Sequence, residues 1–307
     1  MKRVVVALGG NALGETPEKQ KEMAVITAKN LIPIIKAGFE VVITHGNGPQ
    51  VGLINLAFTE GHKHDEKISL MPFSECGAMS EGYIGYHLTN ALTCEFAKEN
   101  INKHVVSIVT QVEVDKDDKA FLNPTKPIGS FYTFKEAKKM PYPMKEDALR
   151  GYRRVIASPK PVKVIEEPVI NTLINAGYIV IACGGGGIPV INNNGVYEGV
   201  EAVIDKDFAS SKLANDINSD YLLILTAVDQ VSLNYKQENE IKLSQVSLED
   251  MIKYNELNHF YAGSMKPKVE ASIEFVKQDK NHIAIITSPE KAYDALLGNS
   301  GTTIYNK

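Results

Sequence analysis

The sequence predicts an α/β fold in which a mainly parallel, open β-sheet is covered by helices on both faces. Two observations carry this prediction. Short, β-branched apolar runs bounded by glycine recur along the chain, as is typical of strands buried on both faces. Amphipathic stretches of helical period separate them, and alternating strands and helices favour a parallel sheet between two helical layers. The predicted strands are residues 4–8, 41–44, 105–109, 179–182, 221–225 and 282–287.

Glycine residues mark the ends of the helices that the sequence predicts. A helix expected over residues 18–37 stops at Gly38, and one expected over 163–176 stops at Gly177. A glycine just past the last turn adopts the left-handed conformation that ends a helix. Residues 113–158 interrupt the alternation, since they are rich in Lys, Pro and Tyr and show little periodicity. Long segments of that kind are usually functional, so we expect an insertion or a small lid there.

Composition and charge exclude several classes of protein. At 307 residues the chain has room for one large α/β domain or two small ones. Hydrophobic residues make up 44% and charged residues 23%, close to the soluble globular average, which excludes disordered, collagen-like and coiled-coil chains. The 33 basic and 37 acidic residues are well mixed and give a net charge of -4. A nucleic-acid partner is not expected, because it requires a basic face.

The chain is expected to stay in the cytoplasm. Its first residues combine a basic flank with a short apolar run, but the run stops at Gly9 and Gly10 and no A-x-A cleavage site follows. No stretch approaches the roughly 20 apolar residues that span a bilayer, so no membrane partner is expected. The cysteines are odd in number and lack C-x-x-C spacing, which predicts buried, reduced thiols at Cys76, Cys94 and Cys183.

Three glycine-rich turns directly follow predicted strands. They are Gly9-Gly10-Asn11, Gly46-Asn47-Gly48 and the four-glycine run at residues 184–187. Because ligands bind at the carboxyl ends of parallel strands, we expect the turns to surround one cleft with backbone N–H groups, as a polyanion requires. The first turn taken alone is equally consistent with a simple tight turn. Four successive glycines cost much backbone entropy, and we expect no purely structural reason for them.

Three lysines are candidates for the positive charge of this cleft. No Gly-Lys dipeptide occurs, which excludes a P-loop. Phosphoryl transfer needs cations that offset charge on the transferred group, together with rigid positioning. Prolines flank Lys126, while Lys206 precedes a helix expected over 208–214 and Lys268 opens another helix. The alternative for each lysine is a solvated position on the surface.

Aspartates near these lysines have two possible roles. Asp207 is expected to hold two lysines or to orient the acceptor, because a carboxylate keeps neighbouring ammonium groups charged and directed. Capping of a helix N-terminus is the alternative for Asp207 and for Asp205. Further along, residues 222–231 are predicted to form a buried strand whose final turn offers backbone groups and the Asp229 carboxylate to an adenine or ribose. The His62-x-His64 pair lacks a third ligand, so no protein metal ligand is expected.

Eight segments together resemble the carbamate kinases of the amino-acid-kinase superfamily. They are VVALGGNA, THGNGPQVG, NPTKPIG, SPKP, CGGGGIPV, GVEAVIDKD, ILTAVD and GSMKPKVEA, in the family's order over almost the whole chain. The resemblance implies a three-layer αβα sandwich, a homodimer, and phosphoryl transfer between ATP and carbamate to give ADP and carbamoyl phosphate. Mg²⁺ would be held mainly by nucleotide phosphates and water. The implied cellular role is ATP formation in arginine fermentation.

The resemblance also assigns roles to residues. Around carbamate and the transferred phosphoryl it places Gly9, Gly10, Asn11, Gly46, Asn47 and Gly48. The catalytic set is Lys126, Lys206, Asp207 and Lys268. On the nucleotide side we expect Gly184, Gly185, Gly186, Thr226, Val228, Asp229, Ser264 and Met265. Within one domain (1–307), residues 1–205 would form an acceptor lobe and 206–307 a nucleotide lobe, with 113–158 as a protruding subdomain that brings Lys126 over the site.

Three positions depart from the pattern of relatives. Acetylglutamate kinases carry a lysine in the first strand where this chain has Ala7, and we expect Lys206 or Lys126 to replace that cation. Glu81 stands where glutamine is expected. Lys266 stands where a small or apolar residue is usual, which leaves open which lysine of that turn reaches the nucleotide.

Three alternative functions remain. A superfamily member that acts on a larger acid or on UMP is disfavoured by NPTKPIG and by the missing first-strand lysine. A non-catalytic sensor of ATP or of a metabolite is disfavoured by the intact lysine and aspartate set. A dinucleotide oxidoreductase fits worst, because no G-x-G-x-x-G follows any strand.

Overall fold

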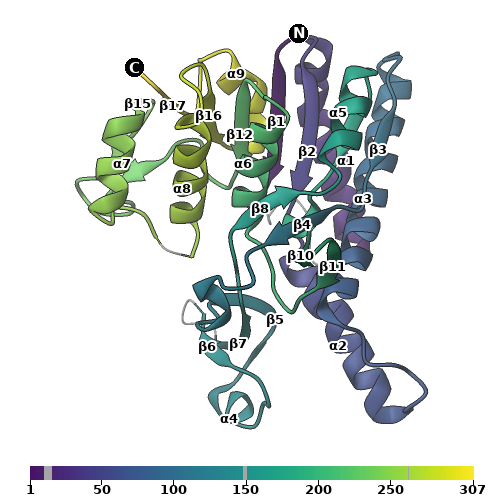
Figure 1. Ribbon diagram of the computed structural model, residues 1–307. Helices are drawn as coiled ribbons and strands as arrows, with labels where there is room; N and C mark the ends of the chain where they lie inside the picture. Colours follow the sequence, from purple (N-terminus) through teal and green to yellow (C-terminus); the bar gives the residue numbers. More distant parts are fainter. Residues whose placement is uncertain (10–15, 148–150, 262) are drawn as a thin grey trace.

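An eight-stranded sheet forms the centre of the molecule (Figure 1). The computed structural model describes residues 1–9, 16–147, 151–261 and 263–307. The strand order is β15-β17-β16-β12-β1-β2-β9-β3. Among the described residues, each neighbouring pair in this sheet is parallel except β16 with β17. The strands are β1 (Arg3–Leu8), β2 (Glu40–His45), β3 (Val105–Ser107), β9 (Ile179–Ile181), β12 (Tyr221–Leu225), β15 (Gln245–Ser247), β16 (Ile283–Thr287) and β17 (Thr302–Tyr305).

Helices cover both faces of this sheet, as the sequence predicts. Successive residues of a strand point to opposite faces, so Val4 and Val6 of β1 pack in one apolar cluster and Val5 and Ala7 in the other. One face is covered by α1 (Pro17–Lys36), α3 (Phe73–Lys98) and α9 (Ala292–Leu296). The other is covered by α5 (Glu167–Asn175), α6 (Lys206–Asp216), α7 (Leu248–Glu256) and α8 (Met265–Val276). The result is the three-layer αβα sandwich.

Two of the predicted helices can be compared with the observed ones. The helix predicted at 18–37 is α1, which ends before Gly38 at φ +86°. The helix predicted at 163–176 is correct only from residue 167 onward. Its first two residues belong instead to strand β8 (Pro161–Val164), where Val164 pairs with Val112 of a neighbouring strand. Tertiary pairing therefore overrides the helical pattern at that end.

A second, four-stranded sheet lies beside the first and has the order β11-β10-β4-β8. Its other strands are β4 (Gln111–Val114), β10 (Ile188–Asn193) and β11 (Val196–Gly199). A further two-stranded sheet pairs β13 (Ser232–Leu233) with β14 (Ile241–Lys242). The short 3₁₀ turns are η2 (Lys119–Phe121), η3 (Gly184–Gly186) and η4 (Pro289–Lys291).

The segment that lacks periodicity contains a small sheet of its own. Strands β5 (Lys126–Tyr132), β7 (Tyr152–Ile156) and β6 (Met144–Glu146) pair in that order, and α4 (Phe134–Ala137) follows β5. These elements project from the main body beside α2 (Gly48–His64) (Figure 1). A register shift between Ile128 and Tyr132 disturbs the pairing, so the alternation that marks a strand is lost from the sequence. Residues 113 and 114 lie in β4, outside this projection.

The cysteines differ in part from the prediction. Cys76 and Cys183 are buried, whereas Cys94 is exposed on α3. All are free thiols. In the part of the chain that the structure describes, none of the helices combines the length and the apolar character needed to cross a bilayer.

Candidate active site

Two of the predicted glycine-rich turns meet at one edge of the central sheet. Strands β2 and β9 are parallel neighbours, so the turns that follow them lie at the same edge. Gly46, Asn47, Gly48 and Gly185 line a cavity of about 180 Å³ there, together with Lys126, Lys206, Asp207 and Lys268. We call this cavity the lysine pocket. Gly10 and Asn11 lie outside the described residues, and Gly9 borders a separate cavity beside Thr226 and Ala227.

Asp207 joins two of the three candidate lysines. Lys206 Nζ donates to Asp207 Oδ1 at 2.6 Å, and Lys268 Nζ donates to Asp207 Oδ2 at 3.0 Å. Asp207 is only 2% exposed. Its place is fixed by the start of α6, because Asp205 caps that helix by accepting from the Asp207 backbone N–H at 3.0 Å. Asp205 therefore caps the helix, and Asp207 pairs with Lys206 and Lys268.

The electrostatic state of this cluster follows from burial and pairing. Burial alone would raise the pKa of Asp207, but the ammonium groups of Lys206 and Lys268 outweigh it and lower that pKa to about 2. Burial also lowers the pKa of Lys206, and the Asp207 carboxylate opposes this shift. The aspartate is therefore ionised at neutral pH. Two lysines against one aspartate leave the cluster positively polarised, which suits a phosphoryl group.

Lys126 reaches the same pocket from the projecting sheet. It forms an ion pair with Asp205, 79 residues further along the chain. Strand β5 lies close against α2, because a Cβ on Gly52 would be 2.4 Å from the Gly129 Cα. Only glycine at this crossing allows such an approach. The packing of the projection on α2 thus sets the position of Lys126.

The four-glycine run has structural reasons, contrary to the sequence prediction. Gly185 has φ +67°, and a Cβ there would lie 2.0 Å from Nδ2 of Asn47. At Gly184 a Cβ would lie 2.6 Å from the His45 ring. The two glycines that follow also have positive φ and no room for a Cβ. Close packing behind the lysine pocket therefore requires the run, whether or not a ligand touches it.

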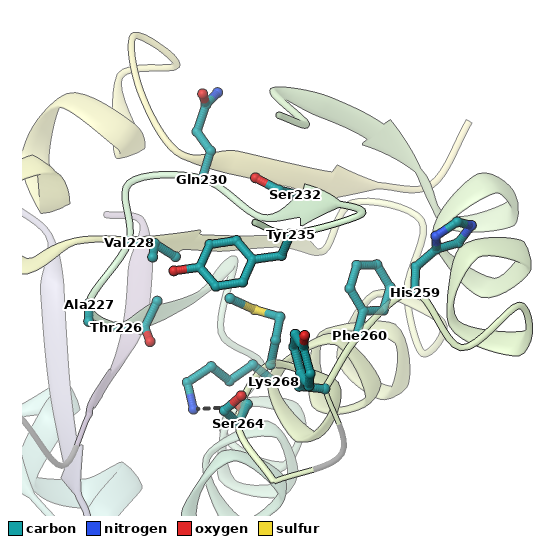
Figure 2. Close-up of a pocket in the computed structure, with 12 residues that line it drawn as sticks. Thr226, Ala227, Val228, Gln230, Ser232, Tyr235, His259, Phe260, Ser264 and Lys268 are labelled. Atoms are coloured by element: carbon teal, nitrogen blue, oxygen red, sulfur yellow. Dashed lines mark hydrogen bonds between the residues drawn. The ribbon is translucent and has the colours of Figure 1, made fainter. Parts of the chain in front are cut away.

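A second cavity, of about 210 Å³, lies between the turn after β12 and the start of α8 (Figure 2). We call it the aromatic cavity. It is lined by Thr226, Ala227, Val228, Gln230, Ser232, Tyr235, His259, Phe260, Tyr261, Ser264, Met265 and Lys268. Flat aromatic walls and a polarisable thioether suit an apolar ring such as a nucleobase. Lys268 and Ser264 line both cavities, so the two spaces adjoin.

Four of the residues predicted on the nucleotide side lie in the wall of this cavity. Thr226, Val228, Ser264 and Met265 line the aromatic cavity. Asp229 is exposed and lies outside its wall. Residues 184–186 are buried behind the lysine pocket, which only Gly185 borders, so their placement differs from the predicted nucleotide side. This difference arises because the run follows β9, on the far side of β1 and β2 from β12.

Several residues that line the cavities were not predicted from the sequence. Tyr235, His259 and Phe260 line the aromatic cavity (Figure 2), and the His-Phe-Tyr cluster just before GSMKPK is the sequence signal for the last two. Lys266 turns away from the site and donates to Asn258 Oδ1 at 3.1 Å, so Lys268 is the lysine of that turn in the pocket. His62 contacts the Ile68 carbonyl oxygen through Nδ1 at 2.7 Å.

Comparison with known proteins decides the family. The amino acid kinase family matches over residues 2–287. The chain is 50% identical over 310 residues to carbamate kinase 3 of Staphylococcus aureus, with 100% of both chains covered. It is 51% identical to the carbamate kinase of Clostridium perfringens, over 98% of this chain and 99% of that relative. This chain belongs to the carbamate kinase family.

A solved carbamate kinase superposes closely on this chain. Carbamate kinase from Giardia lamblia bound to AMP-PNP has a TM-score of 0.92 and 45% identity, over 100% of this chain and 99% of that one. UMP kinase from Bacillus anthracis, at 17% identity and a TM-score of 0.53, shares the fold alone. A carbamate kinase-like protein of Escherichia coli, YqeA, is 51% identical over 99% of both chains. Family membership makes this chain a kinase.

Proposed function

We propose that this chain catalyses reversible phosphoryl transfer between ATP and carbamate, giving ADP and carbamoyl phosphate. The observation that carries the proposal is the Asp207 cluster, which holds two lysines at the junction of the lysine pocket and the aromatic cavity. A small acid beside Gly46 and Gly48 and a nucleotide in the aromatic cavity would meet at Lys268. The names of the relatives support carbamate as the acid.

The reaction needs charge compensation more than covalent chemistry. In the direction of ATP formation, the bond between phosphorus and the carboxyl oxygen of carbamoyl phosphate breaks. An oxygen of the terminal phosphate of ADP forms the new bond, and carbamate leaves with the electron pair. Lys206 and Lys268 lie at fixed positions to offset the charge on the transferred oxygens, and Lys126 of β5 lines the same pocket. Backbone N–H groups at the glycine turns would orient the acid.

Mg²⁺ belongs to the proposal as a companion of the nucleotide. Throughout the described residues, no group of three or more His, Cys, Asp and Glu side chains could hold a metal ion. Both aspartates of the pocket are already paired with lysines. These residues fit a metal that is held by phosphate oxygens and water. When bound there, Mg²⁺ would neutralise part of the phosphate charge.

The proposal extends to assembly and cellular role. We include a homodimer, a cytoplasmic location, and ATP formation in arginine fermentation. The homodimer and the cellular role rest on the resemblance to the carbamate kinases. We also propose that residues 1–205 bind the acceptor, with 113–158 as the lid, and that residues 206–307 bind the nucleotide.

A coupled assay tests the activity. Purified protein given ADP, Mg²⁺ and carbamoyl phosphate is expected to make ATP, measured through hexokinase and NADPH formation. The control is the same mixture without ADP, because carbamoyl phosphate decomposes spontaneously. Phosphorylation of acetylglutamate, aspartate or UMP without ATP formation from carbamoyl phosphate would contradict the assignment.

A further inference from the structure

Glu81 is a buried acid that the proposed chemistry does not use. It lies on α3 and is only 2% exposed. Its Oε2 accepts a hydrogen bond from the Thr110 backbone N–H at 2.7 Å. Its Oε1 is also buried and has no hydrogen-bond partner among the described residues. A buried carboxyl with one free oxygen is costly unless it carries a proton or performs a task.

Thr110 connects Glu81 to both ends of the four-glycine run. Thr110 Oγ1 accepts from the Cys183 backbone N–H at 3.0 Å, and the Thr110 carbonyl oxygen accepts from the Ile188 N–H at 2.8 Å. Glu81 also packs directly on the run, since a Cβ on Gly184 would lie 3.0 Å from the Glu81 Cγ. The amide that Glu81 holds therefore belongs to the residue that closes the loop 183–188.

The residue before Glu81 fixes the second turn of the lysine pocket. Asn47 Nδ2 donates to Ser80 Oγ at 2.8 Å. Asn47 in turn packs against Gly185, where no Cβ fits. Two successive residues of one helix thus hold the turns after β2 and β9 in contact with each other. Both Asn47 and Gly185 line the lysine pocket.

The surroundings of Glu81 favour its neutral form. Burial raises the pKa of Glu81 well above its ordinary value, the Thr110 N–H opposes this, and the nearby carboxylate of Glu166 adds to it. Glu166 itself accepts from the Gln111 N–H at 2.7 Å. The His45 ring also packs against Gly184, and burial lowers the pKa of His45 to about 4, so it brings no positive charge at neutral pH. Burial raises the pKa of the Cys183 thiol, which stays neutral.

We propose that Glu81 is a positioning residue which, as a neutral carboxylic acid, holds Thr110 and through it the glycine run against Asn47 at the wall of the lysine pocket. The carbonyl-type oxygen accepts from Thr110, and the proton sits on the other oxygen. Ionisation leaves an unpaired charge beside Glu166 and loosens the loop. The kinetic part of this inference rests on the proposed carbamate kinase activity, whereas its structural part does not.

Kinetics of matched variants test the inference first. Glu81→Gln keeps the acceptor and the shape, and is expected to hold kcat and KM within about twofold at pH 7. Glu81→Ala leaves the Thr110 amide unpaired and is expected to raise KM for carbamoyl phosphate about tenfold. Glu95→Gln and Glu95→Ala are the controls, because Glu95 is a buried acid of the same helix whose partner is the surface lysine Lys98. Unchanged KM in folded Glu81→Ala would overturn the proposal.

The pH profile separates positioning from simple packing. Wild-type activity is expected to fall at alkaline pH as Glu81 ionises, while Glu81→Gln retains activity to higher pH. Protein stability should show the same pH dependence, and it can be measured without substrate. The neutral acid is favoured in the folded state, so stabilisation by Glu81 is full below its ordinary pKa of 4.5 and declines as pH rises toward the folded value. The Tm of Glu81→Gln should therefore rise relative to the Tm of the wild type as the pH increases from 5 to 8.

Hydrogen exchange gives the readout that is independent of activity. Amides of residues 183–188 should exchange faster in Glu81→Ala than in Glu95→Ala, and should stay protected in Glu81→Gln. If the wild type makes no ATP, the proposed function fails while this measurement still decides the positioning role. If Glu81→Ala does not fold, the pH dependence of Glu81→Gln decides it. A Tm difference between Glu81→Gln and wild type that is constant across pH would overturn the neutral-acid role.

Discussion

The lysines of the pocket are presented in two different ways. Lys206 and Lys268 stand at the first turns of α6 and α8 in the main body, and both bind the buried Asp207. Lys126 stands on the projecting sheet, with its side chain 34% exposed, and binds the helix cap Asp205. Folding of the core fixes the first pair, whereas the docking of a small sheet on α2 places the third lysine. The two arrangements should respond differently to substitution.

Asp207→Asn should give the largest effect. It removes the counter-charge of two lysines, and removing one partner of a buried pair costs about 3 kcal/mol or more. Activity should fall at least about 100-fold, because both cations lose their fixed position. Urea unfolding and the ATP-forming assay measure the two effects. Asp216→Asn, on the same helix and paired with Lys212, is the control and should change either quantity little. A fully active, equally stable Asp207→Asn would remove the cluster from the mechanism.

Lys126→Ala should affect activity alone. A half-exposed ion pair contributes little to stability, about 0 to 1 kcal/mol, so the urea midpoint should stay near that of the wild type. Turnover should fall about 100-fold if this lysine offsets charge in the transition state. Lys135→Ala, an exposed lysine of α4 in the same projection, serves as the control. Wild-type turnover in Lys126→Ala would mean that Lys206 and Lys268 supply the positive charge without Lys126.

Lowering the pH should have the smallest effect, a loss of the stability that Asp207 contributes through its pairs with Lys206 and Lys268. The pKa of Asp207 is lowered from 3.8 to about 2 in the folded state, so the stability it contributes is complete above pH 3.8 and is lost as pH falls through 2. A shift of this size corresponds to about 2 kcal/mol. Unfolding free energies from pH 5 down to pH 2 should show this loss in the wild type. Asp207→Asn should lack that component, and an identical slope in both proteins would mean that other acids dominate.

Local pattern was enough for much of the fold. Every predicted strand lies in the central sheet, because short β-branched runs flanked by glycine have few other solutions in a chain that alternates with helices. Strands β15 and β17 were missed, since β15 is only three residues long and β17 follows the last recognised pattern. The turns after β2 and β9 lie at one edge, as predicted, since parallel pairing brings the carboxyl ends of neighbouring strands together, while Gly10 and Asn11 lie outside the described residues.

Side-chain partners at the site were harder to predict. The lysine and aspartate types are recognisable, and the sequence predicts that Asp207 holds two lysines, but it leaves helix capping open for both Asp205 and Asp207. Their separate roles depend on which carboxylate faces α8 and which faces the projecting sheet. The close packing that requires glycine in the four-glycine run could not be predicted either, for the same reason. Its need for glycine comes from His45, Asn47 and other residues that only the folded chain brings beside it.

The sequence by itself determined most strands of the central sheet, where glycine lets the backbone turn, and which cations stand near those turns, because these properties reside in neighbouring residues. Tertiary structure alone decided that Lys126 meets Asp205, that Lys268 rather than Lys266 faces Asp207, and that Glu81 sits buried against Thr110. Such contacts join residues tens of positions apart. They depend on how the faces of sheets and helices pack, and this packing cannot be predicted from local periodicity.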